Sequence, residues 1–152
     1  MRALVSVLEC SYMRTNRPTA VREDYLRAIF RAHERGDGSV RLIDISTHLG
    51  LSRSTVSERV RELVAQGLVE HTKYGHVHLT RRGHAIAQNV THKHRVMEVF
   101  LHDVLKLSKS EAHEEAHKLE HALSDKVIKR IGVLLGSPQV DPHGSRIPQL
   151  QS

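Results

Sequence analysis

The chain has 152 residues and a mass of 17.2 kDa, which suits one domain of ordinary size or two small domains that share a core. Hydrophobic residues make up 39% of it, but no apolar run approaches the length of a membrane span, so a membrane-spanning protein is excluded. The single cysteine excludes an internal disulfide framework and fits a cytoplasmic protein, and the net charge of +6 favours an acidic partner.

The first predicted element is a helix. Residues 1–18 are expected to form a loose tail in which Met13 is an alternative start, and a helix then runs from 19 to about 35. Its apolar residues recur at a spacing of about 3.6, so one face is expected to pack on the rest of the protein. The glycine-rich segment 36–38 ends it.

The next segment, 42–80, has the order of a winged helix-turn-helix. A short helix (42–49), a glycine turn in which Ser52 can act as a cap, and a second helix (53–66) precede two strands, 68–72 and 77–80. In such a unit the second helix enters the major groove of DNA. We therefore expect a winged-helix DNA-binding domain at 19–82.

The predicted second helix carries basic and hydroxyl side chains in its first turns, where base edges are within reach. The few aromatic residues, 3% of the chain, argue against the stacking platforms that bind RNA or single strands. The open alternative is a winged helix that binds protein through an ordinary solvated face. The candidate DNA-binding residues are Arg53, Ser54, Thr55, Ser57 and Arg59, with Lys73 and Tyr74 at the tip of the wing.

Three further helices are predicted after the wing. Thr80 is expected to cap a long helix that ends near Leu105, and a capping-box pattern at 108–111 opens the next. Ser124 caps the last helix, which 136–138 ends. The fold class is thus mainly α, with a helical domain at 83–138 and a coil at 139–152. The last helix is expected to turn Val127, Ile128, Ile131, Leu134 and Leu135 inward.

Histidine is unusually frequent in the helical segment. Of the 13 histidines, seven lie between His84 and His121. Residues at i and i+4 share a helix face, so two helices that pack together could join two imidazole–carboxylate groups around an ion. Nitrogen and oxygen ligands without thiolate suit manganese, iron, cobalt, nickel or zinc. The candidates are His94 and Glu98 on the long helix and His113, His117, Glu120 and His121 on the next; the alternative is a polar face that binds no ion.

Residues 113–117 also match the H-E-x-x-H motif of zinc proteases. Protease chemistry requires a third ligand elsewhere, an open coordination position and a substrate cleft. The chain has Glu120 and Leu123 where the longer metzincin motif has glycine and histidine. A zinc metallohydrolase is therefore the least favoured alternative, and we expect no enzymatic activity.

The chain resembles the diphtheria-toxin-repressor and manganese-transport-regulator family of metal-activated repressors, in its two-domain form. The resemblance extends in order from about residue 19 to residue 149. Its motifs are Glu23-Asp24-Tyr25-Leu26, Ser54-Thr55-Val56-Ser57, Gly67-Leu68-Val69, Val77-His78-Leu79-Thr80-Arg81-Arg82-Gly83, Lys93-His94-Arg95, Leu119-Glu120-His121 and Asp141-Pro142-His143-Gly144.

The resemblance implies a set of ligand positions. It implies a main metal site at Asp24, His117, Glu120 and His121, and a second site at His94, Glu98 and His113. An aspartate at the position of Asp24 implies a response to Mn²⁺. Arg27 stands where manganese regulators often carry a carboxylate, and His117 where relatives more often have Glu or Cys, so Fe²⁺ and Zn²⁺ stay open.

The resemblance further implies a repressor that binds double-stranded operator DNA as a cytoplasmic homodimer, without a membrane or a small-molecule substrate. The last two helices are expected to form the dimer interface. The ion is expected to tie Asp24 to the later helix, so activation should fade as the pH falls toward about 6.5. A winged-helix transcription factor that works without metal is the remaining alternative.

Overall fold

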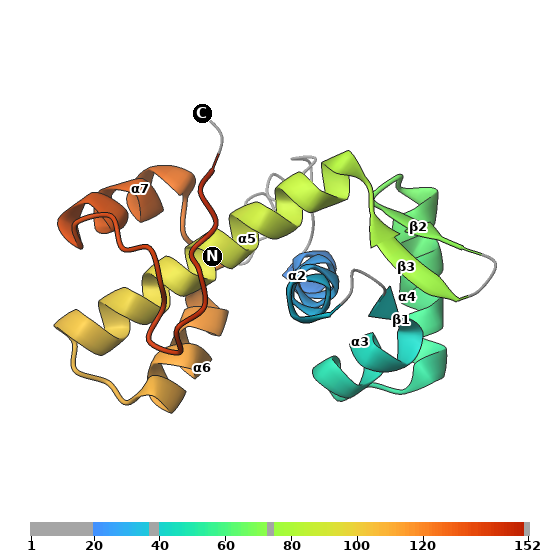
Figure 1. Cartoon of the computed structure of the whole chain (residues 1–152), viewed down its shortest axis with the longest axis horizontal. Coiled ribbons are helices and arrows are strands. Elements are labelled where there is room, and N and C mark those ends of the chain that lie inside the picture. The colour runs from blue at the N-terminus through green and yellow to red at the C-terminus, as the bar shows by residue number, and fades with distance from the viewer. Residues whose placement is uncertain (1–19, 37–39, 73–74, 151–152) are drawn as a thin grey trace, which may run out of the picture.

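The computed structural model describes residues 20–36, 40–72 and 75–150. The expected tail at 1–18 and the wing-tip candidates Lys73 and Tyr74 lie outside the described residues. Within the described part, the chain forms two lobes that one long helix, α5, connects (Figure 1). The expectation of a mainly helical fold is confirmed.

The first lobe combines helices with a small antiparallel sheet. The strand order is β1-β3-β2, with Val40 opposite Val77 and Val69 opposite Leu79. The sequence did not predict β1, because two residues are too short to show an alternating pattern. The elements in chain order are α2 (Ala20–Arg35), β1 (Val40–Arg41), α3 (Leu42–Leu49), α4 (Arg53–Ala65), β2 (Val69–His71) and β3 (His76–Leu79).

The turn between α3 and α4 follows the expected local chemistry. Gly50 ends α3 in the left-handed conformation, with φ of 65°. The Ser52 side chain then accepts a hydrogen bond from the backbone N–H of Thr55 at 3.2 Å and caps α4. Val56, Val60 and Leu63 on the opposite face of α4 are buried, so the first turn of α4 remains at the surface.

The second lobe is helical. The predicted caps are confirmed: Thr80 accepts from Gly83, Ser108 and Glu111 form a capping box, and Ser124 accepts from Val127. Helix α5 packs against α2 in the first lobe and against α6 and α7 in the second. The elements are α5 (Arg81–Val99), a π-helical extension η1 (Phe100–Val104), α6 (Lys109–Leu119) and α7 (Asp125–Leu134).

One part of the prediction for the last helix is wrong. Ile128 is buried as expected, but Val127 is 41% exposed and Leu134 is 72% exposed. The apolar stripe of α7 is wider than the face that α5 covers. A strip of apolar side chains therefore remains on the surface of the single chain.

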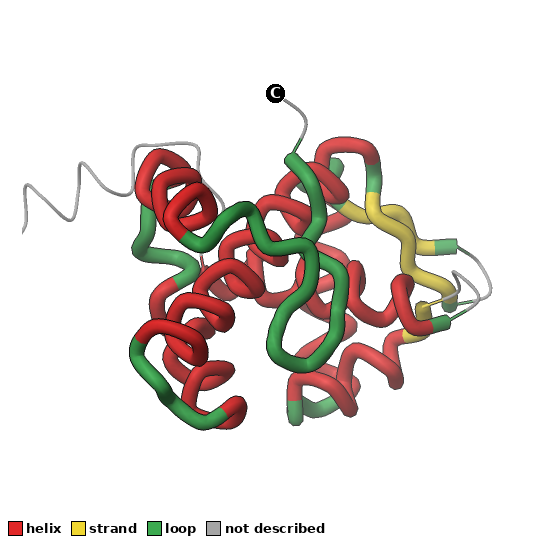
Figure 2. Tube along the Cα trace, turned by 60° about the vertical axis from the view of Figure 1, so that its left-hand side comes forward, coloured by secondary structure: helices red, strands yellow, loops and turns green. Residues whose placement is uncertain are grey.

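The C-terminal segment 139–150 is irregular but it packs along α5 (Figure 2). The Gln88 amide donates to the backbone carbonyl of Gln149 at 2.9 Å, and Ile147 is buried in the core of the second lobe. This contact positions the loop 140–146 beside α5. None of the described helices combines the length and the apolar composition that a membrane span requires.

Gly83 lies in the first turn of α5, directly against the backbone of Leu68. A Cβ at this position would lie 1.9 Å from the Leu68 carbonyl oxygen, which cannot move aside as a flexible side chain would. We expect Gly83→Ala to lower the free energy of unfolding by about 1–3 kcal/mol, the usual cost of overpacking, in urea denaturation. Gly132→Ala is the control, because a Cβ there meets nothing within 4 Å. Equal stability of the two variants would contradict this account.

Candidate metal centre

The first group of candidate ligands joins the two lobes. Asp24 on α2 meets Glu120 and His121 at the end of α6, together with His117 one turn earlier; we call these four residues the main set. Asp24 Oδ1 lies 2.9 Å from His121 Nε2, and Glu120 Oε1 lies 3.3 Å from both His117 Nδ1 and His121 Nε2. One ligand atom of each residue lies within 4.8 Å of the others. Glu120 is 1% exposed whereas the His117 side chain is 46% exposed, so the main set opens to solvent on one side.

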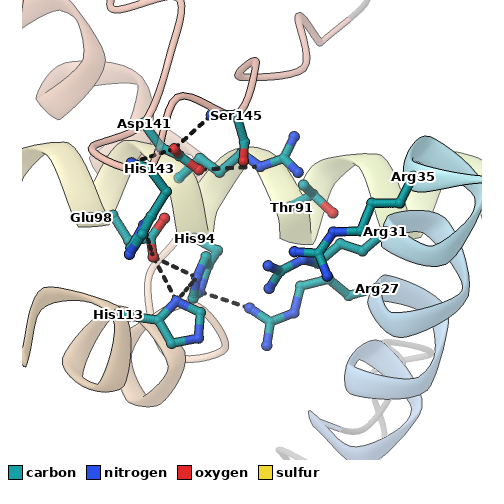
Figure 3. A pocket seen from close by; sticks show the side chains of 11 residues that line it. Arg27, Arg31, Arg35, Thr91, His94, Glu98, His113, Asp141, His143 and Ser145 are labelled. Carbon is teal, nitrogen blue, oxygen red and sulfur yellow. Dashed lines mark hydrogen bonds and ion pairs between the residues drawn. The ribbon is translucent and has the colours of Figure 1, made fainter. Parts of the chain in front are cut away.

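A second group surrounds Glu98. Glu98 Oε1 lies 2.6 Å from His113 Nδ1 and 3.2 Å from His94 Nε2. The loop 140–146 adds Asp141 and His143, whose ligand atoms also lie within 4.8 Å of one another and of Glu98. We call these five residues the Glu98 set. Figure 3 shows their side chains converging from α5, α6 and the loop.

Asp141 and His143 were not predicted as ligands. They lie in the segment expected to be a coil and belong to a motif that carries the family resemblance. The one available signal was an acidic residue and a histidine two positions apart in a segment of turn residues. Nothing local in that segment indicates which helix it contacts.

The two histidines of the H-E-x-x-H motif belong to different groups. His113 is in the Glu98 set and His117 is in the main set, and no group of candidate ligands among the described residues contains both. Glu114, which would be the general base of a protease, is exposed. The geometry of a zinc protease, in which both histidines hold one ion, is therefore not present in this helix.

The electrostatics of the two sets follow from burial and hydrogen bonding. Burial alone would lower the pKa of His121, but hydrogen bonds to Asp24 and to Glu23, at 2.5 Å from Nδ1, outweigh it and raise the pKa to about 9. Burial alone would raise the pKa of Glu98, but hydrogen bonds to His94 and His113 lower it to about 2. Glu23, which is part of a resemblance motif but was not predicted to act at the site, therefore acts on His121 from outside the main set.

The raised pKa of His121 changes the expected pH dependence. A metal-binding imidazole must lose a proton, so we expect the Mn²⁺ affinity to rise about tenfold per pH unit up to about pH 9 rather than to level off near 6.5. In the metal-free protein, the raised pKa of His121 makes the stability of the fold depend on pH in the opposite direction. The raised pKa stabilises the fold fully below about pH 6.5, and this contribution is lost as the pH rises toward about 9.

Calorimetric titration with Mn²⁺ between about pH 6.5 and 8.5 measures this dependence. Glu23→Gln, which removes one of the two carboxylates that face His121, should shift the pH dependence to lower pH. A Mn²⁺ affinity that is flat over this range would contradict the assignment of His121 as a ligand.

Arg27 lies between the two sets, and other arginines line a cavity beside it. Arg27 on α2 is 7% exposed and forms an ion pair with Glu120 at 2.7 Å. A cavity of about 280 Å³ beside it is lined by Arg31 and Arg35 on α2 and by residues of the Glu98 set (Figure 3). Arg95, on the same cavity, is bound by the carboxylates of Glu34 and Asp141.

The DNA-binding candidates of α4 lie at its exposed N-terminal end. Arg53, Ser54 and Thr55 are exposed, and Ser57 and Arg59 are partly exposed. Within the first turn the Ser54 and Thr55 hydroxyls lie 2.9 and 2.8 Å from Ser52 Oγ. Arg59 forms an ion pair with Glu62 on the same helix. Arg53 is the first residue of α4 and is exposed there.

Two family models match the chain. The iron-dependent repressor N-terminal DNA-binding domain matches residues 18–77, and the iron-dependent repressor metal-binding and dimerisation domain matches residues 80–149. The observed order of a small winged domain and a helical domain agrees with both. The predicted family resemblance and fold class are confirmed.

Curated relatives and solved structures agree with the models. The chain is 38% identical to the iron-dependent repressor IdeR of Mycobacterium tuberculosis over 84% of this chain and 55% of the relative. It is 31% identical to an HTH-type transcriptional regulator of Methanocaldococcus jannaschii over 74% of this chain and 90% of that one.

A solved manganese-dependent transcriptional repressor in complex with manganese is 40% identical, with a TM-score of 0.78 over 86% of this chain and 62% of that one. The chain spans about half the length of the iron-dependent repressor IdeR and of the diphtheria toxin repressor that it matches. On the two family models, which together cover most of its residues, the chain belongs to the iron-dependent repressor family.

Proposed function

We propose that this protein is a metal-activated transcriptional repressor that binds double-stranded operator DNA as a homodimer in the cytoplasm. The main set carries the proposal, because it brings Asp24 of the DNA-binding lobe to His121 of the helical lobe, 97 positions later in the chain. The affinity of the main set for an ion therefore depends on the relative position of the two lobes. Ion binding and DNA binding must then favour each other equally.

The donor chemistry of the main set fits a divalent transition-metal ion. Two imidazoles and two carboxylates, without thiolate, suit Mn²⁺ or Fe²⁺, and the carboxylates favour Mn²⁺. When bound, the ion would supply positive charge where Asp24 and Glu120 converge. Asp24 would then hold α2, and Glu120 and His121 would hold the end of α6, so the two lobes keep one orientation. The Glu98 set is proposed as a second ion position.

The exposed strip of α7 supports the dimer. Val127, Val133 and Leu134, all on this helix, are 41%, 66% and 72% exposed, and apolar side chains gathered on a surface mark interaction sites. The family model that covers this helix is a metal-binding and dimerisation domain. A second copy on this lobe would set two α4 helices in successive major grooves, about 34 Å apart on B-DNA.

Fluorescence anisotropy of labelled promoter DNA tests the proposal. The protein is titrated with Mn²⁺, Fe²⁺, Zn²⁺ or chelator at one stated salt concentration, because phosphate contacts make affinity depend steeply on salt. Arg53→Ala should weaken binding by about 1–3 kcal/mol if Arg53 reads a base. Equal affinity in chelator and in every metal would favour the metal-independent transcription factor instead.

A further inference from the structure

Arg27 occupies the space between the two ligand sets. Its Nη1 atom lies 2.7 Å from Glu120 Oε2 and 2.7 Å from His94 Nδ1, and its Nη2 atom lies 3.0 Å from His117 Nδ1. The guanidinium thus touches the main set through Glu120 and His117, and the Glu98 set through His94. Because the side chain is 9% exposed and arginine stays protonated in proteins, a permanent positive charge lies at this point.

The two oxygens of Glu120 have different partners. Oε1 faces the ligand atoms of His117 and His121, at 3.3 Å from each. Oε2 faces Arg27 at 2.7 Å and His94 Nδ1 at 2.5 Å. While Arg27 holds Oε2, only Oε1 is available to an ion in the main set.

The same contacts assign the two nitrogens of His94. Its Nδ1 lies 2.5 Å from Glu120 Oε2 and 2.7 Å from Arg27 Nη1, whereas its Nε2 lies 3.2 Å from Glu98 Oε1. His94 therefore contributes to the Glu98 set through Nε2, and its Nδ1 is not free for an ion on the side of the main set. A carboxylate that fixes a ligating imidazole in this way also orients its ring.

We propose that Arg27 serves as a built-in cation that keeps the two metal positions apart, so that each set takes its own ion and no ion lies between them. This inference rests on the proposed function. An additional ion bridging the sets would need Glu120 Oε2 and His94 Nδ1, the atoms that Arg27 contacts, and like charges would repel at that distance. The protein is therefore expected to bind no more than one ion in each set, with Glu120 as a monodentate ligand.

The test uses Mn²⁺ as the probe on the full chain. Equilibrium dialysis with elemental analysis gives the number of ions per subunit, and electron paramagnetic resonance shows whether Mn²⁺ ions share a bridging ligand, since a bridged pair is exchange-coupled. We expect wild-type protein to take up at most two ions per subunit with uncoupled spectra. Arg27→Glu, which replaces the cation by a ligand, should gain about one ion and a coupled spectrum.

Arg31→Gln is the matched control, because Arg31 lies one turn further on the same helix, lines the same cavity, and forms no hydrogen bond or ion pair with Glu120. It should keep the wild-type stoichiometry and spectrum. Circular dichroism verifies that each variant is folded. If Arg27→Glu does not fold, the stoichiometry and spectrum are compared between wild-type protein and Arg27→Gln, which removes only the charge.

A coupled Mn²⁺ pair in the wild-type protein would overturn the inference, as would an Arg27→Glu protein that matches wild type in stoichiometry and spectrum. These failures are distinct from failure of the proposed function. Two uncoupled ions in a protein whose DNA binding ignores metal would support the role of Arg27 and refute the repressor mechanism. Wild-type protein that binds no Mn²⁺ would overturn both.

Discussion

Asp24→Ala is expected to abolish the Mn²⁺-dependent part of operator binding. Asp24 is the member of the main set that belongs to α2, and it reaches His121 Nε2 at 2.9 Å. Without it, the remaining ligands all lie on α6 and the turn after it, so an ion no longer connects the two lobes. Loss of even an outer ligand partner costs about 10–100-fold in metal affinity, and we expect at least this loss here.

Calorimetry with Mn²⁺ and anisotropy with promoter DNA measure the two effects separately. Glu114→Ala is the control, because Glu114 is exposed on α6 and belongs to neither set. It should bind Mn²⁺ and DNA as wild type does. If Glu114→Ala instead removed a peptide- or ester-hydrolysing activity, the zinc metallohydrolase would be favoured. If operator binding by Asp24→Ala depended on Mn²⁺ as it does in wild-type protein, the assignment of the main set as the ion site would be contradicted.

Glu120→Ala is expected to destabilise the metal-free protein by about 3–5 kcal/mol, because it leaves the charge of Arg27 buried without its carboxylate. Glu120 is 1% exposed and also accepts from His94, so no solvent replaces the lost partner. Urea denaturation in chelator gives the free energy of unfolding. The exposed pair Arg59–Glu62 offers a comparison, since Glu62→Ala should cost no more than about 1 kcal/mol.

The double variant Arg27→Met with Glu120→Leu separates the loss of a charge partner from the loss of packing. Replacing both members of a buried pair by apolar residues of similar size is often close to neutral. The double variant should therefore recover most of the stability that Glu120→Ala loses. Equal stability of Glu120→Ala and Glu62→Ala would show that Arg27 finds another partner or solvent.

Local sequence signals determined the helices of the fold and the helix face that carries part of the candidate metal ligands. The cap at Ser52, the left-handed Gly50 and the capping box at Ser108 and Glu111 each depend on atoms within a few residues of one another. For this reason the helix boundaries and the order of the winged helix followed from the chain alone. The spacing of His117 and His121 likewise placed both on one face of one helix.

The division of the ligands was decided only by tertiary packing. Helical spacing says that His113 and His117 point the same way, but not that α5 meets the first and α2 the second. Asp141 and His143 lie beside Glu98, which is more than forty positions earlier in the chain, and Ile147 packs the same loop into the core of the second lobe. Arg27 looked like a departure from the ligand pattern, and its burial between Glu120 and His94 depends on three helices at once. Such placements arise from burial and charge pairing between distant segments, which no local pattern encodes.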